Sequence, residues 1–277
     1  MIEGQSIINL IQKRTSVRTY DKKPVESTKL EQFSSFLASV KNPFGAQVRF
    51  VLTESSEQKI GTYGFIKGAK TYFAGCVKKG GMDMEGFGYA FEHAVLYATA
   101  LGLGTCWLGG TFKRSTFLDQ MKPADEFLPA VSPIGYAAER KSLTERAVAA
   151  GAGARSRKRF GEVFLDGGAA KPLMPDDGAL KTCLEMVRIG PSASNKQPWR
   201  VIVKDGACHF YAVVDKRYAG NTMYGFTMQR VDLGIAACHF ELSARELGLA
   251  GGFVVEDPKL VTDEMLTEGW YYGFSWH

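Results

Sequence analysis

The chain has 277 residues, of which 45% are apolar and 23% are charged, a composition typical of soluble globular proteins. This length is long for one hydrophobic core and suits two domains of ordinary size. The net charge of +5 is modest and the basic residues are scattered, which argues against a nucleic-acid partner but allows a bound phosphate group.

The N-terminal stretch, residues 1–13, is short and amphipathic and lacks the features of a secretory signal. No apolar run approaches the roughly 18 to 20 residues that a membrane-spanning helix needs, so we expect a cytoplasmic protein with no membrane contact. The cysteines are odd in number and never spaced as C-x-x-C, and the few histidines form no metal-binding pattern. We therefore expect no metal site, thiols that fill the core, and packing roles for His93 and His239.

Apolar periodicity predicts the elements of the first half in chain order. It indicates a helix over residues 30–40, a strand over 49–53, a strand-like run over 71–77, a helix over 91–102, and strands over 105–108 and 129–136. Four glycines, Gly80, Gly81, Gly86 and Gly88, follow the run over 71–77 with the wrong spacing for a dinucleotide-binding motif. We expect them to form a loop near a pocket mouth.

The second half repeats this order. The pattern predicts a helix over residues 180–189, a strand over 200–203, a helix over 233–247, a strand over 251–255, and a strand-like run over 270–274. The sequence Leu-Gly-Leu-Gly at 101–104 matches Leu-Gly-Leu-Ala at 247–250, at an offset of about 145 to 150 residues. Chance similarity is the alternative, but we favour a duplicated domain, with halves at 1–150 and 151–277 joined by the Ala/Gly-rich residues 147–154.

Two pairs of arginines are candidates for binding an anion. Arg14 and Arg18 flank Thr15 and Ser16, so charged donors and short hydroxyl donors lie within one five-residue segment. Arg155 and Arg157 form a similar pair at the start of the second half. Taken alone, either pair is more typical of ordinary solvated basic residues near a helix end than of a phosphate site.

The segment Pro191-Ser-Ala-Ser-Asn-Lys-Gln-Pro-Trp199 lies between a predicted helix and a predicted strand. A helix stop explains its first part, because Gly and Pro break helices and Ser and Asn form local turns. It does not explain why Asn195, Gln197 and Trp199 lie before the strand. The two amides can bind a chain of hydroxyl groups or the edge of a heterocycle.

The segment Gly102-Leu-Gly-Thr-Cys-Trp-Leu-Gly-Gly110 has two interpretations. It is compatible with a glycine helix cap followed by a strand and a tight turn. Alternatively, Gly109 and Gly110 allow backbone N–H groups to approach a flat ring closely, since glycine has no Cβ.

These segments resemble the motifs of the FMN-dependent nitroreductases. The Arg14–Arg18 segment is similar to the opening motif of that family, Pro191–Trp199 to its second motif and 101–110 to its third, while Arg155 and Arg157 fit its late basic pair. The resemblance implies an α+β fold with a mostly antiparallel sheet flanked by helices. It also implies FMN sites at a homodimer interface, with the Pro-Ser-x-x-Asn segment supplied by the other subunit.

The chain departs from this pattern in a complementary way. The first half has the shorter Asn42–Gln47 in place of Pro-Ser-x-x-Asn, and the second half has Leu249–Gly252 in place of Gly-Thr-Cys-Trp. Each half thus keeps the motif that the other half has lost, so the two halves together can form one pocket, here called the composite pocket. The chain resembles the single-chain branch of the family, which implies tandem domains forming a pseudo-dimer, one FMN per chain and a monomer.

The resemblance assigns roles to individual residues. Arg14, Arg18, Arg155 and Arg157 would hold the phosphate, next to Thr15, while Ser16, Asn195 and Gln197 would provide polar contacts to the phosphate, the ribityl chain or the ring. The edge of the flavin ring would be lined by Pro191, Ser192 and Ala193. Backbone N–H groups of Trp107, Leu108, Gly109 and Gly110 would face its N5 and O4 side, and residues 221–226 are a candidate lid or pocket wall.

The activity implied is an FMN-dependent NAD(P)H oxidoreductase that transfers hydride through flavin N5 to a nitroaromatic, quinone or related acceptor. We expect no catalytic side chain. Because no G-x-G-x-x-G motif follows a strand, NADH or NADPH would bind only transiently. Two alternatives stay open, which are another flavin chemistry such as dehalogenation or flavin breakdown, and a flavin-binding sensor or scaffold without turnover.

Overall fold

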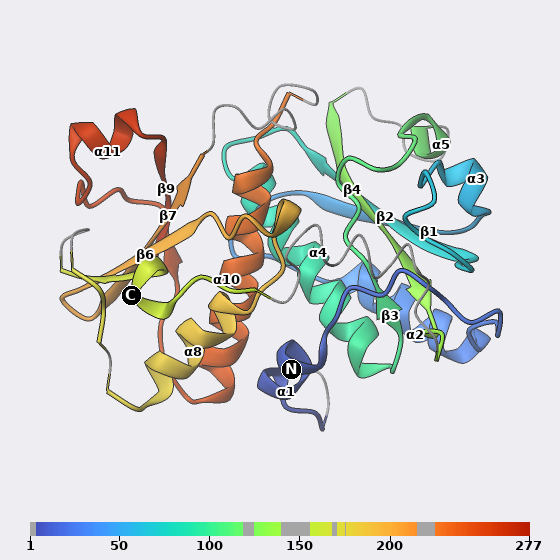
Figure 1. The fold of residues 1–277 in the computed structure, drawn as a ribbon, viewed down its shortest axis with the longest axis horizontal. Helices are drawn as coiled ribbons and strands as arrows, with labels where there is room; N and C mark the ends of the chain where they lie inside the picture. The colour runs from blue at the N-terminus through green and yellow to red at the C-terminus, as the bar shows by residue number, and fades with distance from the viewer. Residues whose placement is uncertain (1–3, 119–124, 140–155, 168–170, 175, 215–224) are drawn as a thin grey trace.

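A computed structural model describes residues 4–118, 125–139, 156–167, 171–174, 176–214 and 225–277 (Figure 1). The first half contains α1 (Ile7–Lys13), α2 (Ser27–Ser39), β1 (Val48–Glu54), α3 (Glu57–Ile60), β2 (Thr71–Lys78), α4 (Asp83–Ala100), β3 (Gly104–Thr105), α5 (Ser115–Leu118) and β4 (Glu126–Gly135). The second half contains α7 (Phe160–Val163), β5 (Phe164–Asp166), α8 (Ala179–Arg188), the 3₁₀ turn η1 (Ala193–Asn195), β6 (Trp199–Lys204), β7 (Ala207–Val213), α10 (Met228–Glu246), β8 (Phe253–Val254), α11 (Asp263–Thr267) and β9 (Trp270–Trp276).

Two separate sheets confirm the predicted α+β fold with two related halves. The first sheet has the order β1-β2-β4-β3 and is antiparallel throughout. The second has the order β5-β6-β7-β9-β8, and only its β5–β6 pair is parallel. The expected boundary between residues 150 and 151 lies outside the described residues and stays a prediction.

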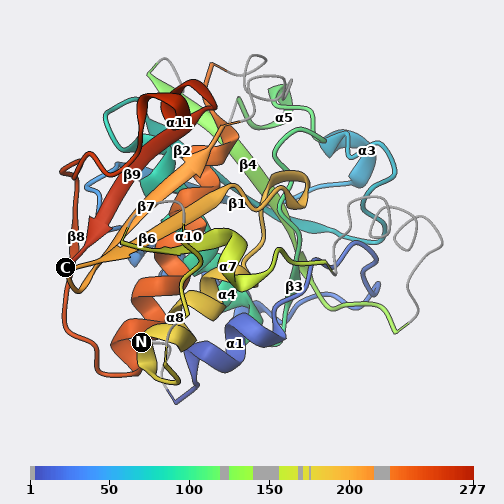
Figure 2. The ribbon, with the colours of Figure 1, turned by 60° about the vertical axis from the view of Figure 1, so that its left-hand side comes forward.

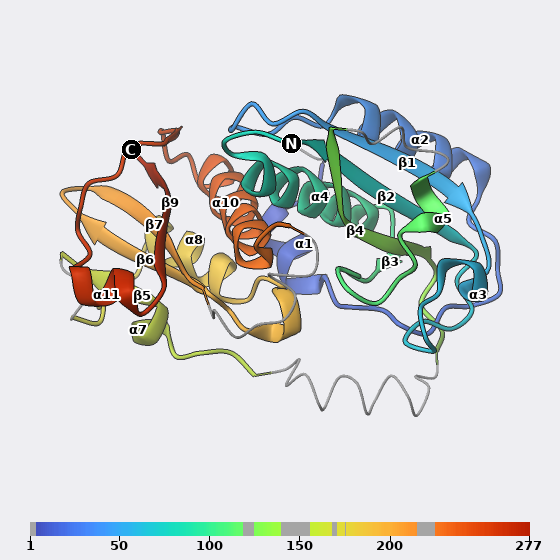
Figure 3. The ribbon, with the colours of Figure 1, turned by 90° about the horizontal axis from the view of Figure 1, so that it is seen from above.

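The long helices α4 and α10 lie against each other between the two sheets (Figure 3). Every residue of α10 from Met228 to Ala244 is buried except Arg230. The helices approach so closely that a Cβ added at Gly88 would overlap the Val231 carbonyl oxygen, and one added at Gly234 would overlap that of Glu85. The same sequence offset relates Gly88 to Gly234 and Glu85 to Val231, so the contact is reciprocal, as in a two-fold symmetric dimer.

This contact corrects the expectation that Gly86 and Gly88 lie in a loop. Both belong to α4, which begins at Asp83, while Gly80 and Gly81 do precede the helix. Glycine weakens an isolated helix, so the sequence pattern favours a loop there. At Gly88 the backbone of α10 takes the place of a side chain, and that tertiary packing outweighs the local preference.

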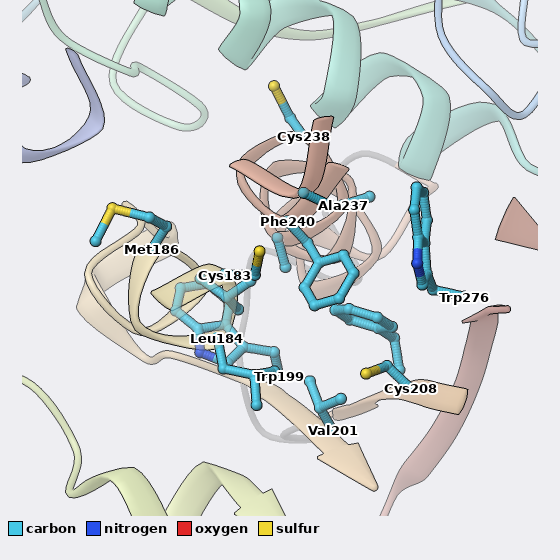
Figure 4. Packing of buried hydrophobic residues seen from close by; sticks show 14 of the residues in the cluster. Cys183, Leu184, Met186, Trp199, Val201, Cys208, Ala237, Cys238, Phe240 and Trp276 are labelled. Carbon is cyan, nitrogen blue, oxygen red and sulfur yellow. The ribbon is translucent and has the colours of Figure 1, made fainter. Parts of the chain in front are cut away.

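The two halves also exchange segments. The apolar face of α1 (Ile7, Leu10 and Ile11) lies in the core of the second half, beside α8 (Figure 2). That core is built around Trp199, Phe240 and Trp276 from β6, α10 and β9 (Figure 4).

Two loops extend the exchange in opposite directions. Phe44, from the loop before β1, contacts Phe253 and Phe274 of the second half. Ala193, from the loop before β6, packs against the core of the first half. Within the described residues, no helix is long and apolar enough to cross a bilayer.

Candidate functional site

The Arg14–Arg18 segment runs along the edge of the first sheet, next to the Gly-Trp segment. Ser16 and Thr105 form a parallel bridge, and the Val17 N–H donates to the Thr105 carbonyl at 2.8 Å. A Cβ at Gly104 would lie 2.6 Å from Val17 Cγ2, so glycine is needed for this approach. The first and third sequence motifs are therefore adjacent in space.

A buried carboxylate on α4 holds both of these segments. Trp107 Nε1 donates to Glu92 Oε2 at 2.6 Å, and Arg14 Nε lies 3.8 Å from Glu92 Oε1. The Glu92 side chain is 0% exposed and the Arg14 side chain 8% exposed. The positions of the Arg14 guanidinium and the Trp107 indole are thus fixed by one acidic group.

The loop between α8 and β6 has an unusual backbone. Three residues that are not glycine have positive φ, namely Ser194 at 49°, Asn195 at 53° and Gln197 at 48°. Such left-handed conformations cost of order 1 to 3 kcal/mol each and concentrate at functional sites. The sequence pattern predicts a loop here, and the structure adds that the loop is held in a strained shape.

Side-chain hydrogen bonds maintain this shape. The Gln197 N–H donates to Ser192 Oγ at 2.9 Å, and the Ala193 N–H donates to Asp232 Oδ1 of α10 at 2.9 Å. The buried Gln197 amide accepts from the Lys158 N–H at 2.8 Å and donates to the Asn195 carbonyl at 3.2 Å. The amide of Gln197 is thus engaged inside the protein, where it supports the loop.

Replacing Gln197 tests this supporting role. We expect Gln197→Ala to lower the free energy of unfolding by about 2 to 3 kcal/mol, because it removes the hydrogen bonds of the Gln197 amide to the Lys158 N–H and the Asn195 carbonyl. Chemical denaturation measures the change. Gln32→Ala, on the exposed face of α2, is the control and should change stability by less than about 0.5 kcal/mol. Equal effects of the two variants would contradict the role.

The basic pair is close to the same loop. Arg157 donates to Asn195 Oδ1 at 3.3 Å and to the Ile189 carbonyl at 3.1 Å, and Asn195 Nδ2 donates to the Ser156 carbonyl at 3.2 Å. Burial lowers the pKa of the Arg157 guanidinium below its ordinary value, and the positive charges of Arg14 and Arg188 lower it further. Arg14 and Arg157, from opposite halves, are therefore close enough to repel each other. Arg155 lies outside the described residues.

The glycine segment meets the second half at the start of α10. A Cβ at Gly109 would lie 2.7 Å from Met228 Cε, so the absence of a side chain at Gly109 makes room for Met228. Trp107 and Ala193 pack against the same apolar cluster, to which Met228 also belongs. The third motif and the Pro-Ser-x-x-Asn loop thus lie around one group of side chains.

One expected donor is already engaged. The Leu108 N–H donates to the Val131 carbonyl at 2.9 Å, within a pair of backbone hydrogen bonds to β4. This corrects the expectation that the Leu108 N–H faces a ligand, because the sheet edge uses it. In the part of the chain that the structure describes, the N–H groups of Gly109 and Gly110 make no hydrogen bond.

Three polar residues of the site were missed by the sequence reasoning. Glu92 and Asp232 lie on the buried faces of α4 and α10, and Arg114 Nη2 donates to the Gly109 carbonyl at 2.7 Å. The available signal was an acidic residue within a largely apolar helical stretch, seen at Glu92 and Asp232. No local motif marks Arg114.

The cysteines and the candidate lid add little to the site. All five thiols are free and buried, as expected for core residues, and burial raises the pKa of Cys76, Cys183 and Cys208 to about 12. In the candidate lid, residues 221–224 lie outside the described residues. Phe226 is buried against Phe127, with ring centroids 5.3 Å apart.

The fold and the site define a single-chain pseudo-dimer of the nitroreductase type, with motif segments from both halves brought to one place. A family model described as "Putative TM nitroreductase" matches residues 6–244, and the chain belongs to this family. A search of curated proteins found no match.

Three solved structures illustrate the similarity. A protein from Thermotoga maritima described as a "putative nitroreductase" is 20% identical, covers 98% of this chain and 92% of its own, and has a TM-score of 0.61. A Bacteroides fragilis nitroreductase with bound FMN is 20% identical, with 50% of this chain and 92% of its own covered and a TM-score of 0.42. Iodotyrosine deiodinase bound to FMN and 3-iodo-L-tyrosine is 17% identical, covers 50% of this chain and 92% of its own, and has a TM-score of 0.42. At 20% identity, the similarity to the Thermotoga maritima protein is one of fold.

Proposed function

We propose that the chain binds one FMN between its two halves and acts as an NAD(P)H-dependent oxidoreductase. The observation that carries the proposal is that Arg14 of the first half lies near enough to Arg157 of the second half for its charge to lower the Arg157 pKa, while Arg157 donates to Asn195. Family membership supports the choice of flavin. Because the first half lacks Pro-Ser-x-x-Asn and the second half lacks Gly-Thr-Cys-Trp, the proposal is limited to one site per chain.

The phosphate end fits the residues that are present. Arg14 Nε is buried and has no hydrogen-bond partner within the described part of the chain, although a buried donor normally has one. The repulsion between Arg14 and Arg157 would be relieved by a bound anion. Guanidinium groups bind phosphate oxygens in a bidentate manner, so both arginines are suited to the phosphate of FMN.

The ring end has complementary features. The open N–H groups of Gly109 and Gly110 would donate to the ring, with their peptides fixed by the bond from Arg114 to the Gly109 carbonyl. Residues 191–193 would line one edge, since the bond from the Ala193 N–H to Asp232 holds them in place. Met228 and Trp107 would exclude water from this end. The bound FMN would supply hydride transfer through its N5, from NADH or NADPH to a nitroaromatic, quinone or related acceptor.

Three spectroscopic observations on the purified protein test the proposal. We expect yellow protein that loses its colour with NADH or NADPH in the absence of oxygen and recovers it with a nitroaromatic or quinone acceptor. Colourless protein that does not bind added FMN would contradict the proposal entirely. Yellow protein that neither nicotinamide bleaches would instead indicate a flavin-binding protein without turnover.

Substitutions in each half test the composite pocket. We expect Arg14→Ala and Asn195→Ala each to weaken FMN binding by roughly 1.5 to 3 kcal/mol, because each removes a polar or charged contact to the same ligand. Fluorescence titration with FMN measures the dissociation constants. Arg49→Ala, which breaks an ion pair with Glu126 on the first sheet, is the control and should leave FMN affinity unchanged. An effect of Arg14→Ala alone would contradict a pocket shared by the two halves.

A further inference from the structure

Glu92 has a third partner, which comes from the second half. His239 Nε2 of α10 lies 2.9 Å from Glu92 Oε1, and His239 Nδ1 lies 2.8 Å from the Met186 carbonyl of α8. The side chains of Glu92 and His239 are both 0% exposed. Arg14, the half-buried Trp107, Glu92 and His239 therefore form one cluster, here called the Glu92 cluster, that links the two halves next to the proposed pocket.

The hydrogen-bond chemistry of His239 requires an extra proton in this cluster. A neutral imidazole has one N–H and one lone pair, whereas a carbonyl oxygen and an ionised carboxylate are both acceptors. His239 contacts one of each, so a neutral ring beside an ionised Glu92 would place a lone pair against an acceptor oxygen. A second proton, either on the imidazole or on Glu92, removes this conflict.

The duplication shows that only one side of the molecule has this cluster. The offset that relates Gly88 to Gly234 also relates His93 to His239, and it places Cys238 at the position equivalent to Glu92. His93 therefore has no equivalent carboxylate. Burial lowers the pKa of His93 to about 4, so this ring is neutral at physiological pH. The carboxylate occurs in the half that retains Arg14 and Trp107, which connects it with the pocket.

We propose that Glu92 and His239 share one buried proton and together act as positioning residues, which hold the Trp107 indole and the Arg14 guanidinium at the pocket. The pocket role rests on the proposed function, because it assumes that FMN binds there. Glu92 provides the acceptor for Trp107 and the counter-charge for Arg14. His239, anchored to α8 through Met186, holds the carboxylate between α4 and α10.

Other charged and titratable groups lie near the cluster and must be separated from it. They are Tyr89 and His93 on α4, Cys238, Glu241 and Arg245 on α10, and Arg157 and Arg188 near the end of α8. All of these residues are unchanged in Glu92→Gln. The difference in the pH dependence of unfolding between this variant and the wild type therefore isolates the shared proton. The amide introduced by Glu92→Gln can still accept from Trp107 and can donate to a neutral His239.

The first test uses the flavin-free protein and does not depend on FMN. The shared proton gives the folded wild type one more bound proton at neutral pH than folded Glu92→Gln, whereas the two unfolded chains differ only in a carboxyl group that is ionised there. The ratio of the wild-type unfolding constant to that of Glu92→Gln should therefore rise with pH above neutrality, by at most about tenfold per pH unit. Urea unfolding of both proteins across this range measures the ratio, and a ratio that does not change would overturn the shared proton.

The second test measures FMN affinity by fluorescence titration. We expect Glu92→Ala to weaken binding at least tenfold and Glu92→Gln to recover most of it, because only the latter keeps an acceptor for Trp107. Glu241→Ala is the matched control, since Glu241 is also a buried carboxylate between α4 and α10, bound by Tyr89 and Arg245, and it should change affinity less than twofold. Folded Glu92→Ala with wild-type affinity would overturn the positioning role. A wild type that does not bind FMN would instead refute the proposed function, while the pH test of the shared proton would still apply.

Discussion

Asp232→Asn is expected to stabilise the flavin-free protein at neutral pH and to remove much of its loss of stability between pH 4 and pH 8. Asp232 is fully buried on α10, and its Oδ1 accepts from the Ala193 N–H. Its Oδ2 is also buried and has no hydrogen-bond partner within the described residues. Burial raises the pKa of Asp232 to about 8 from an ordinary value of 3.8.

The sign of the pH effect follows from proton binding. Below about pH 4 the carboxyl is protonated in both the folded and the unfolded chain, so it does not affect the pH dependence. As pH rises from about 4 to about 8, the unfolded chain releases this proton while the folded chain retains it. Stability therefore falls by up to about 1.4 kcal/mol per pH unit and levels off above the folded pKa.

The asparagine variant removes this titration but keeps the acceptor for Ala193. At pH 7 the variant no longer suffers the loss of stability that the buried carboxyl causes. Its amide NH₂ is left without a partner in the core, which offsets part of this, so we expect a net gain of about 1 to 3 kcal/mol. Urea unfolding at several pH values measures the gain. Asp166→Asn, on the exposed end of β5, is the control. A variant with the same pH profile as the wild type would show that Asp232 is already ionised in the folded protein.

Gly234→Ala is expected to be the most damaging single-methyl substitution in the structure. In an exposed helix, alanine in place of glycine is stabilising by up to about 1 kcal/mol. At Gly234 the new Cβ would overlap the Glu85 carbonyl of α4, and main-chain atoms of two packed helices cannot yield as a flexible side chain can. We expect a loss of about 3 kcal/mol or more, or no folded protein.

The reciprocal position provides an internal check on this prediction. Gly88→Ala introduces the equivalent overlap with Val231 and should cause a similar loss. A Cβ at Gly80 would meet nothing within 4 Å, so Gly80→Ala is the control. Thermal and urea unfolding of the three variants measure the effects. Stabilities within about 0.5 kcal/mol of the wild type for Gly234→Ala would contradict the close helix contact.

Local pattern predicts most of the elements of this fold, because their apolar faces repeat with helical or strand periodicity. The helix over residues 180–189 and the strand over 200–203 agree with α8 and β6 to within one residue at each end. The pattern fails at Gly86 and Gly88, where the approach of α10 rather than a local signal decides the conformation. It also makes the strand over 105–108 too long, since pairing within β3 ends at Thr105 and only Leu108 bridges to β4 beyond it.

The candidate site is predictable from the sequence only in part. The motif resemblance identifies the Arg14–Arg18 segment and residues 191–199, but no local rule brings Arg14 beside Trp107 or Arg157 beside Asn195. Those contacts depend on how α4 and α10 pack across the pseudo-two-fold axis. Glu92 and Asp232 are missed for the same reason, because a buried carboxylate and a solvated one look alike in a sequence. Only the three-dimensional partners of each residue separate the two cases.

The number of FMN molecules bound per chain tests the central claim most directly. Titration of the flavin-free protein with FMN, followed by calorimetry or flavin fluorescence, gives this number. We predict one FMN per 277-residue chain, because Arg14 and Trp107 occur only in the first half and the Pro-Ser-x-x-Asn loop occurs only in the second. Two FMN molecules per chain, or none, would contradict a single composite pocket.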